Sequence, residues 1–127
     1  MDQQFEDGLR MRRKVMGEKF VEKAFGNADD FTGPLQEFIT RNAWGTIWCR
    51  EGLDLKTRSF ITLSMLAALG RTQELKGHVR GALNNGAMID EIREVLLHAT
   101  VYCGVPLAVD AFRAAQEVLK EVVPPTK

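Results

Sequence analysis

Residues 71–86, RTQELKGHVRGALNNG, decide the fold and carry the best candidates for chemistry. They predict a short helix with Thr72 as its N-cap and Gly86 as the glycine just past its C-terminus. Apolar residues recur along it at helical spacing, namely Leu75, Val79, Ala82 and Leu83. His78 lies in this stripe or at its edge, with Glu74 four residues earlier on the same face. We therefore expect the helix to direct an imidazole, and with it a carboxylate, toward the protein interior.

Two interpretations of the Glu74 and His78 pair stay open on spacing alone. A histidine on an apolar face is often a core residue with satisfied hydrogen bonds, and Glu/His at this spacing is common on surfaces. The same pair can also act as general acid and base, since histidine titrates near neutral pH. Gly77 and Gly81 each weaken a helix by about 1 kcal/mol relative to alanine, which indicates that something packs closely against this one.

Length and charge exclude several classes of protein. The chain has 127 residues, of which 45% are hydrophobic and 27% charged, and this suits one domain over residues 1–127. The 17 basic and 17 acidic residues give zero formal net charge, so no global attraction to nucleic acid or to an anionic membrane is expected. Near-neutral charge instead favours self-association where apolar patches exist.

The sequence contains no signal for secretion, membrane insertion or a bound metal. Its opening, MDQQFEDGLRMRRK, lacks an apolar core segment, and no apolar run approaches about 20 residues, so we expect a cytoplasmic protein. Cys49 and Cys103 are far apart and are expected to be free thiols. His78 and His98 do not make a convincing metal set, and a structural role is the simpler interpretation of His98. No phosphate-binding loop or Cys-x-x-Cys occurs, so we expect neither a metal nor a cofactor.

Helical periodicity runs through almost the whole chain and predicts an all-α fold of about six helices. The expected helices cover approximately residues 5–25, 31–44, 55–69, 72–85, 90–102 and 106–122. The third and fourth are joined by a three-residue turn at residues 70–72, so they should form a central antiparallel pair. From Phe60 to Leu69 only Thr62 and Ser64 interrupt the apolar run. A helix apolar on nearly all sides is buried all round, which predicts burial against another subunit.

Residues 45–53 are expected to form an irregular loop bracketed by Trp44 and Trp48. The two tryptophans either anchor the loop on the core or wall a pocket, since pockets are mostly apolar with a few placed polar groups. Both interpretations stay open.

Three segments together carry a resemblance to a known family. They are WGTIWCREG, GLDLKTRSFITLSMLAALGR and ELKGHVRGALNNGAMIDEIREVLLHATVYCGVPLAVDAF. The chain resembles the carboxymuconolactone decarboxylase family, most strongly over residues 52–112. This resemblance implies an alkyl-hydroperoxidase-D-like helical fold and a hexamer of three dimers. It also implies cofactor-free decarboxylation in the protocatechuate branch of the β-ketoadipate pathway.

Peroxide-reducing members of the wider superfamily carry a Cys-x-x-Cys pair before the equivalent histidine. By offset from His78, these cysteines fall on Arg71 and Glu74, so the thiol pair is missing here. The absence of this pair argues against disulfide redox chemistry, although the histidine remains.

The resemblance implies a substrate that is an unsaturated lactone with two carboxylates. Arginine is suited to hold the carboxylate that stays, and the candidates are Arg50, Arg58, Arg71 and Arg80. His78 is expected to stabilise charge or deliver a proton, Glu74 to orient it, and Trp44 and Trp48 to form an apolar wall. Two other classes stay open: a non-catalytic helical oligomeric binding protein, and a thiol-dependent peroxidase built on Cys49 or Cys103.

Overall fold

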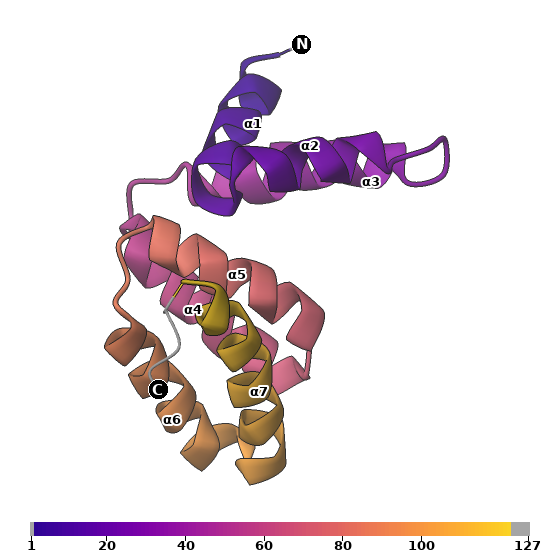
Figure 1. The fold of residues 1–127 in the computed structure, drawn as a ribbon. Coiled ribbons are helices and arrows are strands. Elements are labelled where there is room, and N and C mark those ends of the chain that lie inside the picture. Colours follow the sequence, from indigo (N-terminus) through magenta and orange to yellow (C-terminus); the bar gives the residue numbers. More distant parts are fainter. Residues whose placement is uncertain (1, 123–127) are drawn as a thin grey trace. The chain divides into compact units, whose positions relative to one another are not determined.

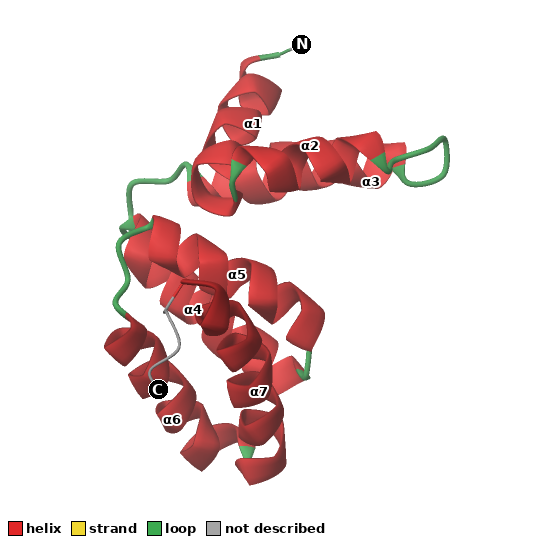
Figure 2. Ribbon diagram, in the orientation of Figure 1, coloured by secondary structure: helices red, strands yellow, loops and turns green. Residues whose placement is uncertain are grey.

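The computed structural model describes residues 2–122. Over this range the chain forms seven α-helices and one π-helix and no strand, which confirms the all-α prediction (Figure 2). Two compact units are present, Met1–Leu55 and Lys56–Lys127 (Figure 1). The organisation as one domain stays a prediction.

The first unit opens with two short helices rather than the single helix predicted for residues 5–25. Helix α1 (Gln3–Met16) is capped by the Asp2 carboxylate, which accepts a 2.9 Å hydrogen bond from the Phe5 amide. Helix α2 (Glu18–Gly26) follows directly. Gly17 separates them with a φ of 97°, a conformation that a continuing helix does not contain. The prediction of one continuous helix was wrong at this residue.

The second half of the first unit contains a π-helix that the sequence analysis did not predict. Helix α3 (Gly33–Phe38) continues into η1 (Ile39–Trp48). The prediction of an irregular loop over residues 45–53 was therefore wrong for residues 45–48. Helix α1 packs closely against η1 through two glycines. A Cβ at Gly8 would lie 2.0 Å from the Thr40 carbonyl oxygen, and one at Gly45 would lie 2.4 Å from the Gln4 carbonyl oxygen. One buried apolar cluster of this unit consists of Val15, Met16, Trp44 and Trp48, and Phe5 and Val21 are buried as well.

The second unit has the four helices that the sequence predicted, with ends that differ by at most one residue. They are α4 (Leu55–Leu69), α5 (Thr72–Asn84), α6 (Ile89–Cys103) and α7 (Val105–Val122). Glycines with positive φ stand at the three connections, namely Gly70, Gly86 and Gly104. The side chain of Glu91 caps α6 by accepting a 2.9 Å hydrogen bond from the Met88 amide.

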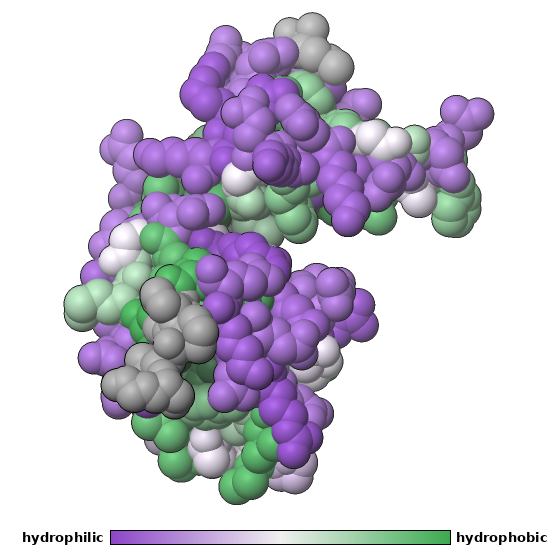
Figure 3. All heavy atoms as spheres, viewed as in Figure 1, coloured by the Kyte–Doolittle hydropathy of each residue, from purple (hydrophilic) through white to green (hydrophobic). Residues whose placement is uncertain are grey.

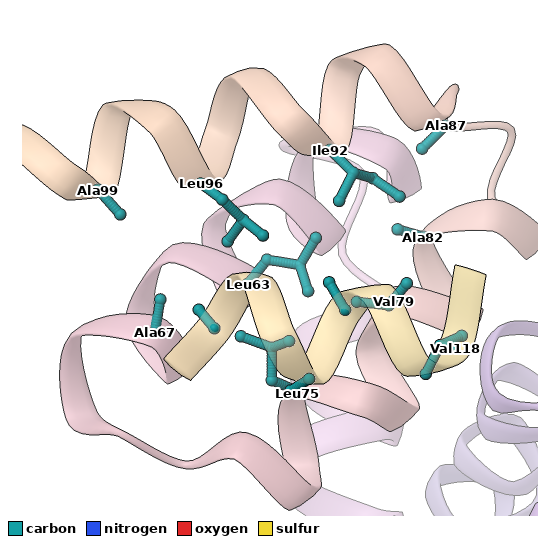
Figure 4. Close-up of a cluster of buried hydrophobic side chains, with 13 residues drawn as sticks. Leu63, Ala67, Leu75, Val79, Ala82, Ala87, Ile92, Leu96, Ala99 and Val118 are labelled. Carbon is teal, nitrogen blue, oxygen red and sulfur yellow. The ribbon is translucent and has the colours of Figure 1, made fainter. Parts of the chain in front are cut away.

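One apolar cluster holds these four helices together (Figure 4). Leu63 of α4, Leu75 and Val79 of α5 and Leu96 of α6 are almost fully buried in it, and α7 packs against both α5 and α6. Only one side of α4 is buried in the single chain, through Ser59, Leu63 and Ala67. Burial of α4 on all sides is therefore not reached within one chain. Among residues 2–122, no helix is both long and apolar enough to cross a membrane.

Candidate functional site

The centre of the candidate site is His78 on α5. Its neighbours Leu75 and Val79 are fully buried, and the Nδ1 atom of His78 is itself buried, so the imidazole lies largely inside the protein. The expectation that this helix directs the imidazole toward the protein interior is confirmed. Gly77 and Gly81 are also buried, which places the glycine side of α5 against neighbouring atoms.

Burial sets the charge of His78. Desolvation lowers the pKa of His78 from 6.5 to about 4, and the negative charge of Glu74 opposes part of that shift. The imidazole is therefore neutral at pH 7, with one ring nitrogen as a hydrogen-bond donor and the other as an acceptor. The expectation that His78 titrates near the operating pH was wrong for the free protein, because the sequence did not reveal how deeply the ring is buried.

Glu74 lies one turn before His78, but its side chain is half exposed. The Glu74 carboxylate pairs with Arg71, whose Nε lies 3.4 Å from Oε1, and Arg71 is 63% exposed. An exposed pair of this kind contributes little to stability. Glu74 therefore influences His78 through its negative charge. The same carboxylate also forms the ion pair with Arg71.

The four candidate arginines lie in different surroundings. Arg80 reaches α7, where its Nη2 lies 3.2 Å from Glu121, so this side chain is directed away from the His78 side of α5. Arg50 is exposed in the first unit. Arg58 on α4 is the least exposed of the four, and its Nε atom is buried. Arg80 is thus engaged with α7, and a substrate-binding role for each of Arg50, Arg58, Arg71 and Arg80 stays a prediction.

Trp44 and Trp48 stack on each other in the core of the first unit. Their ring centroids lie 4.7 Å apart with an interplanar angle of 24°, and both side chains are buried. This is the arrangement that the anchoring interpretation expected. Contact of either tryptophan, or of Arg50, with a substrate stays a prediction.

Sequence reasoning did not single out Ser59 and Asn85, which the structure joins. The Asn85 side-chain amide donates a 2.9 Å hydrogen bond to the Ser59 hydroxyl, and Ser59 is fully buried. One signal was present in the sequence: Ser59 lies four residues before Leu63 and eight before Ala67, so it is a polar residue in phase with an apolar stripe.

The cysteines and possible metal-binding groups are the other candidates for chemistry. Cys49 and Cys103 are both free thiols, as expected. Burial raises the pKa of the Cys49 thiol, which disfavours its reactive thiolate form. Within residues 2–122, no group of three or more His, Cys, Asp or Glu side chains could hold a metal ion.

Comparison with known proteins gives a consistent result. The family model described as "Carboxymuconolactone decarboxylase family" matches residues 33–117. The 4-carboxymuconolactone decarboxylase of Acinetobacter baylyi is 43% identical over 121 residues, covering 95% of this chain and 90% of the relative. The nitrosuccinic acid decarboxylase npaB of Metarhizium robertsii is 46% identical over 119 residues, covering 94% of this chain and 83% of the relative. A 4-carboxymuconolactone decarboxylase sequence from Pseudomonas putida is 40% identical over 43 residues, covering 34% of this chain and 90% of that sequence.

Proposed function

Because the chain belongs to the carboxymuconolactone decarboxylase family, we propose that it converts 4-carboxymuconolactone to 3-oxoadipate enol-lactone and CO2. The observation that carries the proposal is the 43% identity, over 95% of this chain, with a relative named for that reaction. The reaction belongs to the protocatechuate branch of the β-ketoadipate pathway, in aromatic catabolism, and uses no cofactor. Its expected location is the cytoplasm.

The chemistry places three demands on the protein. The bond between the departing carboxylate and the ring carbon beside the ring oxygen breaks, and CO2 leaves. The electron pair delocalises through the ring double bond into the lactone carbonyl, giving a dienolate that then takes up a proton at carbon. The protein must hold the remaining carboxylate, stabilise the new oxyanion and allow the proton to reach carbon.

His78 meets the second demand as a neutral hydrogen-bond donor. With its pKa lowered to about 4 by burial, the ring is uncharged at pH 7 and donates one N–H toward the developing dienolate oxygen. Negative charge on that oxygen raises the proton affinity of the imidazole as the reaction proceeds. Glu74, whose charge already favours the protonated ring, strengthens this response.

Arg58 meets the first demand, which is to hold the carboxylate that remains on the substrate. It is the least exposed of the candidate arginines, since Arg50, Arg71 and Arg80 are all exposed. A guanidinium that is partly withdrawn from water binds a carboxylate more strongly than an exposed one does. In this proposal α4 and α5 form the central antiparallel pair that carries Arg58 and His78.

A second substrate has support of its own. The fungal relative, at 46% identity, is named for nitrosuccinic acid, a molecule with two carboxyl groups and a nitro group. Loss of the carboxylate beside the nitro group leaves a carbanion whose charge passes to the nitro oxygens. That reaction makes the same three demands of the protein, so nitrosuccinate is the second candidate substrate.

One assay compares the two substrates and tests the proposal. Purified protein is incubated separately with 4-carboxymuconolactone and with 2-nitrosuccinate, and CO2 release is measured against a protein-free control. We expect faster release from the lactone. Preferential release from nitrosuccinate would transfer the assignment to the second substrate, and release from neither would exclude both.

We also propose that the chain assembles as a homo-oligomer, as a hexamer built as a trimer of dimers. Large apolar side chains of the second unit face solvent in the single chain, including Val101 and Tyr102, each 77% exposed. Met65 and Leu69 of α4 are exposed as well, and Figure 3 shows apolar residues gathered over the end of this unit where α6 meets α7. Light scattering at micromolar concentration should give a hexamer mass, and a monomer mass would contradict this assembly.

A further inference from the structure

We propose that Ser59 and Asn85 form a positioning clamp, a hydrogen bond that fixes Arg58 on α4 relative to His78 on α5. This inference rests on the proposed function, in which Arg58 holds the remaining carboxylate and His78 contacts the developing oxyanion. Neither Ser59 nor Asn85 needs to touch the substrate. Their role is to set the spacing between two residues that do.

The clamp is a partly buried polar contact, and its Ser59 end lies in an otherwise apolar stripe. The Ser59 hydroxyl is fully buried and accepts a 2.9 Å hydrogen bond from the Asn85 amide. An alanine at this position would pack beside Leu63 without any polar group to desolvate, so the hydroxyl gains little for stability alone. A buried hydrogen bond does provide direction, because it is satisfied in one arrangement of the two helices only.

The clamp joins α4 and α5 at the ends opposite their connecting turn. Helices α4 and α5 are joined at one end by a short turn, where the Arg71 amide donates a 2.9 Å hydrogen bond to the Leu66 carbonyl. The clamp ties their other ends. Arg58 directly precedes Ser59, and His78 lies two turns before Asn85 on the same face of α5. In this proposal, loss of the clamp shifts the first turns of α4 relative to His78.

The Asn85 side of the clamp is itself fixed. The Asn85 amide donates to the carbonyls of Gly81 and Ala82, at 3.0 and 3.1 Å, and Gly86 closes the turn with a φ of 92°. The side-chain amide is therefore held on an ordered helix end. The rest of α5 transmits this placement to His78.

Lys56 also ties the start of α4, through a 3.2 Å ion pair with Glu91, but Glu91 belongs to α6. Lys56 is 40% exposed, and an ion pair at such a site is weak and flexible. It does not set the distance between α4 and α5.

The kinetic test uses Ser59→Ala, Asn85→Ala and the double variant. Thr100→Val is the matched control, because Thr100 is a half-buried α6 hydroxyl that donates a 3.2 Å hydrogen bond to the Leu96 carbonyl. We expect each clamp variant to raise KM by about ten- to a hundredfold with a smaller fall in kcat, the scale of a misplaced binding group. The double variant should be no worse than the more affected single variant, since all three lose one contact. The control should keep the KM of the wild type.

A second readout does not depend on turnover, so it separates failure of the clamp from failure of the proposed function. The chain has two histidines, and proton NMR can follow both, with the exposed His98 as internal reference. Loosening α4 should admit water beside His78 and raise its pKa from about 4 toward 6.5, while Glu74, on the same helix as His78, remains in place. Clamp variants that lose thermal stability as Thr100→Val does, yet keep the wild-type KM and the wild-type His78 titration, would show that the pair serves packing alone.

Discussion

The two compact units differ in what fills their interiors. The second unit is built on one apolar cluster that draws on all four of its helices. In the first unit the apolar cluster is smaller, and an arginine of the same unit, Arg12, is buried as well. The guanidinium of Arg12 lies 6.0 Å from the Phe20 ring and 5.9 Å from the Phe25 ring, and it donates a hydrogen bond to Thr40.

This difference predicts which substitutions should destabilise each unit. A large apolar cluster loses stability when volume is removed, because the cavity does not fully collapse. The contact between α1 and η1 depends on the absence of side-chain atoms at Gly8 and Gly45, so it is sensitive to added volume. Removal of volume should therefore cost most in the second unit, and addition of volume should cost most at the glycine contact of the first.

The largest expected effect is removal of volume from the second unit. Leu75 is fully buried, and Leu75→Ala should lower the free energy of unfolding by about 2–5 kcal/mol, measured by urea denaturation at fixed protein concentration. Leu35→Ala is the control, because Leu35 is 54% exposed and lies outside the apolar surface proposed for assembly. Equal losses in the two variants would mean that burial within the chain does not decide stability here.

Acid should weaken the second unit through His78. The pKa of His78 is lowered from 6.5 to about 4, so between these values the unfolded chain binds a proton that the folded chain does not. Stability is therefore present above pH 6.5 and is lost as the pH falls toward 4, by at most about 3 kcal/mol. His78→Gln should remove this contribution. Parallel pH profiles for the wild type and the variant, over pH 4–7, would contradict the assignment.

The next largest effect is expected from adding side-chain volume at the glycine contact of the first unit. In Gly8→Ala the new Cβ would lie 2.0 Å from a backbone oxygen, so α1 must move away from η1. The expected loss is about 1–3 kcal/mol of unfolding free energy. Gly26→Ala is the matched control, because a Cβ there meets no atom within 4 Å. A stable Gly8→Ala protein would show that the glycine contact is not required.

Sequence predicted the second unit better than the first, and the reason is physical. Helices α4 to α7 have apolar residues at a steady helical period and glycines at their ends, and both signals are local. The break at Gly17 depends on one positive φ, and a π-helix does not follow the α-helical period. Neither feature is visible in a search for helical periodicity.

The candidate site shows the same division between local and long-range information. The placement of His78 on the inner face of a helix follows from its neighbours in sequence. Its lowered pKa, the ion pair of Arg80 with Glu121 and the bond between Ser59 and Asn85 depend on contacts between helices that are distant in sequence. Such contacts become visible only in the folded chain.

The smallest expected effect concerns the thiols. Cys49→Ser and Cys103→Ser, singly or together, should leave decarboxylation within a few-fold of the wild type, because the proposed chemistry uses neither sulfur. Activity per folded protein is the measurement, with circular dichroism to confirm folding. Complete loss of turnover in a folded Cys49→Ser protein would point to thiol chemistry instead.

The central claim is that His78 carries the decarboxylation, and the most direct test is the single-turnover rate of His78→Ala with 4-carboxymuconolactone. We expect kcat to fall by about 10²–10⁴-fold with a much smaller change in KM, because the hydrogen bond forms mainly in the transition state. His98→Ala, which changes the exposed histidine, should retain the wild-type rate. Melting temperatures measured on the same samples separate loss of folding from loss of chemistry. A folded His78→Ala protein that turns over within a few-fold of the wild type would remove His78 from the mechanism.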